Sequence, residues 1–116
     1  MNKLEYRVDS KIIKQLSLFL MLHGIKDFQL EFHSNNKNVQ FIIKAKSIKQ
    51  EIVDFMVEKI GRKRELEIEI YGWELMGDTD SKNELDILGS LIDKIEVKKL
   101  DDYIELTLTR VYRYNE

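Results

Sequence analysis

The chain has 116 residues, of which 43% are hydrophobic and 34% are charged, and its formal net charge is −2. This length favours one domain over residues 1–116, because a fold of this size removes roughly two-thirds of the unfolded chain's surface from water. The near balance of 19 Lys plus Arg against 21 Asp plus Glu argues against a domain that binds nucleic acid by neutralising phosphates.

The sequence also gives expectations about the compartment. It contains no cysteine, which fits a reducing compartment. The start, Met1-Asn2-Lys3-Leu4-Glu5-Tyr6, has no apolar signal core. No apolar run approaches the roughly 20 residues that are needed to cross a bilayer. We therefore expect a cytoplasmic protein without a membrane partner.

The first predicted element is an amphipathic helix near residues 10–23. Asp9 or Ser10 can cap it, its apolar residues recur every three or four positions, and Gly24 supplies a left-handed stop. Further apolar residues widen its apolar face beyond what a helix with one solvated side needs. These residues are Leu18, Met21 and Leu22. Either the helix is deeply packed, or this surplus contacts a partner.

A hairpin and a second helix are predicted next. Apolar and polar residues alternate over 28–33 and again over 39–45, on either side of the Asn-rich cluster 34–38, which is typical of a β-hairpin with one covered face. Ser47 and Gln50 have the spacing of a capping box. They predict a helix that continues through Ile60 and stops at Gly61.

Residues 65–77 are ambiguous between helix and strand. Leu66, Ile68 and Ile70 alternate as in a strand, whereas Leu66, Ile70 and Trp73 share a helical stripe. The glutamates of this stretch are tolerable helix formers, so we favour a helix and keep the strand as the alternative. Tyr71 and Trp73 are either an exposed aromatic anchor for a partner or part of the core.

The last part of the chain repeats the order of helix and hairpin. Ser81 and Glu84 form another capping-box pattern, before a helix that ends near Lys94. Strands follow from Ile95 and from Ile104, with a turn at residues 100–102. The predicted fold is α+β with two layers, in which a four-stranded, mostly antiparallel sheet carries three to four helices on one face. Its order is α-ββ-α-(α)-α-ββ.

This order of elements resembles the ATP-binding fold of sensor histidine kinases. The closer likeness lies in the second half, where Trp73-Glu74-Leu75-Met76-Gly77 and the run from Glu84 to Asp93 are similar to small clostridial-type proteins described as sensor histidine kinase domains. One architecture hosts many functions, so the likeness predicts the fold more directly than the activity.

The motifs that this family uses for nucleotide chemistry are replaced. Where the family's first helix carries Glu and Asn, this chain has Lys14, Gln15 and Ser17. Lys44-Ala45-Lys46-Ser47-Ile48 stands in place of the Asp and glycines that read adenine. The acidic run 78–82 stands in place of a phosphate-binding glycine loop. The resemblance therefore implies a degenerate domain without the family's nucleotide contacts.

We thus predict a non-catalytic regulatory or protein-interaction module, with an altered ATP/Mg-binding domain or kinase component as the alternative. No catalytic, cofactor or metal residues are predicted. His23 and His33 lack a third ligand, and helix capping by Asp80 or Ser81 explains the Asp78-x-Asp80 pattern better than a cation site does. The expected partner is a protein or a second copy. The predicted partner-binding residues are Leu18, Met21, Leu22, Tyr71 and Trp73.

Overall fold

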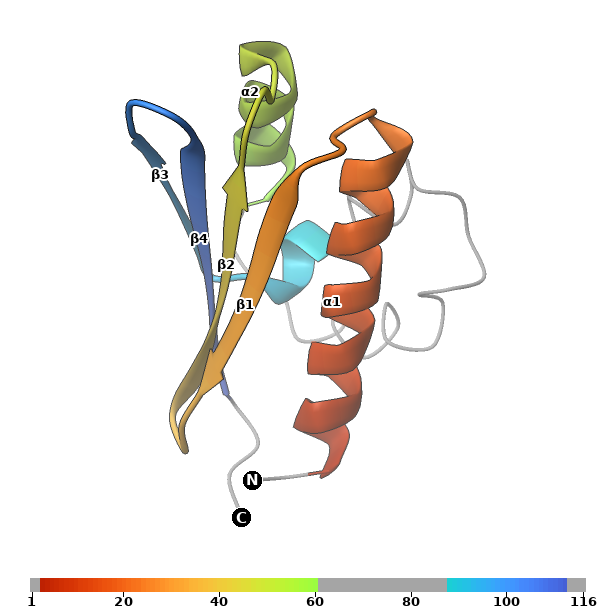
Figure 1. Ribbon diagram of the computed structural model, residues 1–116. Coiled ribbons are helices and arrows are strands. Elements are labelled where there is room, and N and C mark those ends of the chain that lie inside the picture. Colours follow the sequence, from red (N-terminus) through yellow and green to blue (C-terminus); the bar gives the residue numbers. More distant parts are fainter. Residues whose placement is uncertain (1–2, 61–87, 113–116) are drawn as a thin grey trace.

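The computed structural model describes residues 3–60 and 88–112 (Figure 1). A long helix and a hairpin come first, and a second helix, a short helical segment and another hairpin follow. The elements are α1 (Lys3–Leu22), β1 (Phe28–Ser34), β2 (Asn38–Ala45), α2 (Gln50–Lys59), a helical segment at residues 88–91, β3 (Lys94–Lys99) and β4 (Ile104–Val111). The predicted 65–77 element lies outside the described residues.

The described strands form one antiparallel sheet of order β1-β2-β4-β3. Each hairpin supplies two neighbouring strands, and the β2–β4 pairing joins the hairpins, with Phe41 opposite Leu108. Figure 1 shows the described helices on one side of this sheet. The predicted α+β class, the four-stranded antiparallel sheet and the order α-ββ-α-α-ββ are confirmed.

The core lies between that side of the sheet and the helices. Alternate residues of the central strands point into it, as the period-two pattern predicts. The helices contribute the residues of their inner stripes, among them Ile12, Leu16 and Met56, which are fully buried. We call the helix-covered side of the sheet the covered face and the opposite side the open face.

The first helix begins earlier than predicted. It starts at Lys3, and Asp9 and Ser10 lie inside it rather than at its N-terminal cap. Ser10 donates its hydroxyl hydrogen bond to the carbonyl of Arg7, 2.9 Å away, and Asp9 is buried. The extension occurs because Val8 continues the buried stripe beyond the predicted cap. The stop at Gly24 is correct, since this glycine has φ +78°.

Two further helix boundaries differ from the prediction. Lys49 occupies the N-cap of α2, which has no side-chain cap hydrogen bond, and Ser47 has φ 57°, so the predicted capping box does not form. The later helix ends at residue 91 rather than near Lys94. The helix cannot continue to Lys94 because the chain has already joined the sheet at Asp93, whose N–H donates to the carbonyl of Thr109 at 2.8 Å.

Gly89 sits where the late helical segment meets the end of α2. A Cβ atom at this position would lie 1.9 Å from the carbonyl oxygen of Lys59. Only a residue without a side chain therefore allows this close approach. None of the described helices is long and apolar enough to cross a membrane.

Candidate protein-interaction surface

The solvent-facing side of α1 carries a stripe whose two ends differ in chemistry. Its members recur at helical spacing and therefore share one face. We call this set the α1 stripe, and it consists of Arg7, Lys11, Lys14, Leu18, Met21 and Leu22. The stripe runs from basic residues near the start of the helix to apolar residues at its end.

The apolar end of the α1 stripe faces solvent. The exposed fractions are 37% for Leu18, 62% for Met21 and 60% for Leu22. The opposite side of the same turns is buried in the core through Phe19 and Leu20. Single exposed apolar residues are common, but three on adjacent turns of one face form a contiguous patch.

The basic end of the α1 stripe precedes the apolar end by one to three turns. Arg7 and Lys14 are exposed and Lys11 is half-buried. With a net charge of only −2 for the whole chain, these cations are a local feature rather than part of a general excess. The stripe therefore combines exposed positive charge and exposed apolar surface along one helix.

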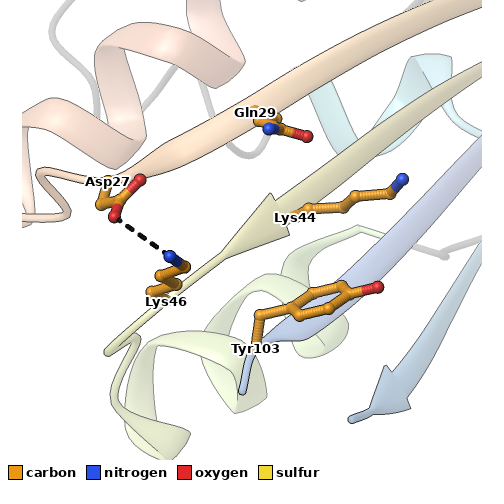
Figure 2. A pocket seen from close by; sticks show the side chains of 5 residues that line it. All are labelled: Asp27, Gln29, Lys44, Lys46 and Tyr103. Carbon is orange, nitrogen blue, oxygen red and sulfur yellow. Dashed lines mark ion pairs between the residues drawn. The ribbon is translucent and has the colours of Figure 1, made fainter. Parts of the chain in front are cut away.

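A shallow hollow of about 270 Å³ lies on the open face of the sheet (Figure 2). Its lining side chains come from β1 and β2 and from residues that flank β1, β2 and β4. They are Asp27, Gln29, Lys44, Lys46 and Tyr103. Its side chains are polar, and the described helices lie on the other face of the sheet (Figure 1).

Carboxylates accompany both lysines of this hollow. Lys44 Nζ lies 2.9 Å from an oxygen of Glu31, and Lys46 Nζ lies 3.8 Å from Asp27. The hydrogen bond from Lys44 lowers the pKa of Glu31, and the same bond raises the pKa of Lys44. The cations are thus locally balanced, so the hollow does not offer the excess positive charge that a triphosphate requires.

A polar cluster is buried between α1 and β4. The Arg110 guanidinium is fully buried and contacts the Glu5 carboxylate, donates to the carbonyl of Leu91 at 3.2 Å, and lies 3.7 Å from Asp9. The Tyr112 hydroxyl donates to Asp9 at 2.5 Å. The contacts with Glu5 and Asp9 join residues more than 100 positions apart in sequence.

The cluster's role is structural, because its charged and polar side chains are buried against one another in the interior. Burial, and then the Asp9 carboxylate, raise the pKa of the Tyr112 hydroxyl far above its usual range, so the hydroxyl keeps its proton and donates it. The sequence analysis missed the cluster. A signal existed, since Arg110 continues the inward alternation of Leu106 and Leu108, and an inward Arg requires a buried acid.

The predicted partner-binding residues divide into two groups. Leu18, Met21 and Leu22 lie together on the α1 stripe, whereas Tyr71 and Trp73 lie outside the described residues. Their role in binding stays a prediction.

The residues of α1 that replace the nucleotide-binding residues of the kinase family either pack inside the fold or lie exposed on its surface. The Gln15 side chain is buried, Ser17 donates its hydroxyl to the carbonyl of Ile13 at 2.8 Å, and Lys14 is exposed. Within the described ranges, no three His, Cys, Asp or Glu side chains gather as a metal site would require. His33 instead lies 3.1 Å from Glu31. The Asp78-x-Asp80 pattern falls outside the described ranges.

Comparison with family models, with curated proteins and with solved structures found no match to this chain. The kinase-domain resemblance therefore remains a prediction that these comparisons do not support.

Proposed function

We propose that this chain is a non-catalytic protein-interaction module that binds an acidic, amphipathic helix of a partner protein through the α1 stripe. The observation that carries the proposal is the exposed apolar end of that stripe. Met21 and Leu22 leave about three-fifths of their surface in water on a helix whose other side is fully packed. Covering such side chains contributes free energy that is roughly proportional to the apolar area removed from water.

The positive charge of the α1 stripe is the reason that we expect the partner helix to be acidic. The cations of the α1 stripe precede its apolar end by one to three turns, so a helix lying along α1 would meet the two chemistries in a fixed order. Carboxylates of the partner opposite Arg7 and Lys14 would set its orientation and accelerate association. Its apolar residues would then cover Leu18, Met21 and Leu22.

The non-catalytic part of the proposal rests on the residues that replace the nucleotide motifs. Gln15 and Ser17 face the protein interior or its backbone instead of a cleft. The lysines of the open-face hollow are balanced by carboxylates. The alternative, an altered nucleotide-binding domain or kinase component, makes a different prediction for the effect of Mg-ATP on stability, which is given in the Discussion.

The experiment compares partner capture by matched variants of the full chain. Lys14→Glu and Met21→Gln should each lower the affinity about tenfold or more, because one removes a charge contact and the other removes apolar burial. Lys98→Glu and Val97→Gln make the same chemical changes at exposed positions of β3 and should leave binding unchanged. Crosslinking with mass spectrometry then locates the bound segment.

The proposal predicts that the crosslinked segment is acidic, apolar on one face and attached near α1. A captured protein whose binding survives both Lys14→Glu and Met21→Gln would refute it. So would crosslinks that map to the open face of the sheet.

A further inference from the structure

The two edges of the sheet differ in how well they are protected against pairing with another strand. β3, at one edge, has six residues, of which Lys94, Lys98 and Lys99 are lysines. Lysine on an edge strand discourages pairing. β1, at the other edge, has seven residues without proline or lysine, and it pairs with β2 one-to-one without a bulge. Among the residues that the structure describes, the β1 edge therefore carries neither the lysines of β3 nor a proline or a bulge.

The hydrogen bonds of the first hairpin show which β1 groups point outward. Asn35 N–H donates to the Asn38 carbonyl at 3.0 Å, and Lys46 N–H donates to the Asp27 carbonyl at 3.1 Å. Because bonded pairs in an antiparallel ladder recur every two residues, the odd-numbered residues of β1 bond to β2. The N–H and C=O groups of Phe28, Leu30, Phe32 and Ser34 therefore point away from the sheet.

Apolar side chains accompany these outward groups. Phe28 and Leu30 are half-buried, and Phe32, whose ring lies 5.8 Å from that of Phe41, is 40% exposed. Figure 1 shows β1 at the sheet edge, with α1 beside it on the covered face. An added strand would satisfy the outward backbone groups and cover Phe32 at the same time.

We propose that two copies of this chain associate by antiparallel pairing of their β1 strands about Leu30, so that two four-stranded sheets become one continuous sheet. This two-fold arrangement places Phe28 of each copy opposite Phe32 of the other on the covered face. On the open face it places Gln29 opposite Glu31, and Asp27 opposite His33. The interface is self-complementary, as a two-fold contact must be.

Charge selects this register over its neighbours. Pairing about Gln29 would oppose Asp27 with Glu31, and pairing about Glu31 would oppose that residue with its own copy, and like charges directly opposite are unfavourable. Pairing about Phe32 would bring Phe28 against the polar turn that follows β1. The register about Leu30 avoids both problems and pairs all of residues 28–32.

The first test is the molar mass in solution, measured by light scattering and sedimentation equilibrium. The wild-type chain should be a dimer at tens of micromolar. Leu30→Pro should be a monomer with an unchanged circular dichroism spectrum, because the lost N–H points away from the β1–β2 ladder and takes no part in that pairing. Leu30→Ala is the matched control, which shortens the side chain, keeps the N–H and should remain dimeric. A wild-type monomer at millimolar concentration, or a dimer that persists in folded Leu30→Pro, overturns the proposal.

The second test determines the register and does not depend on the proline variant. Because the chain has no cysteine, a single introduced cysteine can form only an intermolecular disulfide. Leu30→Cys places two thiols at paired positions, within the Cα separation of about 4.4–6.8 Å that a disulfide allows. Phe32→Cys places them about four strand residues apart, too far to bond. Crosslinking of Leu30→Cys alone supports the Leu30 register, whereas preferential crosslinking of Phe32→Cys overturns it.

A charge change at Gln29 gives a third readout. Each dimer would contain two contacts between this residue and Glu31 of the other copy. Gln29→Lys should therefore tighten the dimer about fivefold, and Gln29→Glu should weaken it by a similar factor. Equal dimerisation constants for the two variants would contradict the register.

Discussion

Replacing Arg110 by methionine should destabilise the fold more than an ordinary core substitution. Methionine keeps much of the arginine's volume but removes the guanidinium from the buried carboxylates of Glu5 and Asp9. Breaking a buried ion pair by removing one partner costs about 3–5 kcal/mol. That loss is a large part of the roughly 5–15 kcal/mol by which domains of this kind are stable.

Urea unfolding at neutral pH, followed by circular dichroism, measures this loss. The double variant Arg110→Met/Glu5→Leu is the matched control. It also removes the Glu5 carboxylate, one of the two that face Arg110, so it should recover part of the stability that the single variant loses. If Arg110→Met lowers the free energy of unfolding by less than about 1 kcal/mol, the cluster does not anchor α1 to β4 and the reasoning is wrong.

Three further predictions concern other parts of the molecule. Gly89→Ala should cost about 1–3 kcal/mol in urea unfolding, because the added Cβ meets the carbonyl of Lys59, and a cost near zero would contradict that close approach. Glu31→Gln should be less stable than wild type at neutral pH. The difference should shrink as the pH falls through the lowered pKa of Glu31, because protonation also removes its bond with Lys44, and a difference that grows on acidification would refute this. Millimolar Mg-ATP should leave the thermal midpoint unchanged, whereas a rise of several degrees would favour the nucleotide-binding alternative.

Local patterns predicted the hairpins well, because the alternation of side chains across a strand is a property of the backbone itself. The C-terminal end of α1 was also predicted correctly, since Gly24 adopts the left-handed conformation that its sequence position suggests. Predictions failed where a distant contact outweighed a local signal. Asp9 has a good capping side chain, but its carboxylate accepts a hydrogen bond from Tyr112, 103 positions away, and so lies inside the helix.

The candidate surface was predictable only in part, for a similar reason. The apolar surplus of α1 is visible in the sequence, but packed and exposed helices share that pattern until neighbouring elements are placed. The unprotected edge could not be predicted, because nothing in the separate hairpins says that β2 and β4 would be the central strands. At Ser47 a local signal was misleading, because the spacing to Gln50 matches a capping box but the Ser47 backbone has φ 57° and the box does not form.

The central place of β4 has a consequence for biosynthesis. Until β4 has left the ribosome, the backbone edge of β2 that pairs with β4 in the folded protein lacks that strand and is open to pairing with other nascent chains. The four-stranded sheet can therefore form only after the second hairpin has been synthesised.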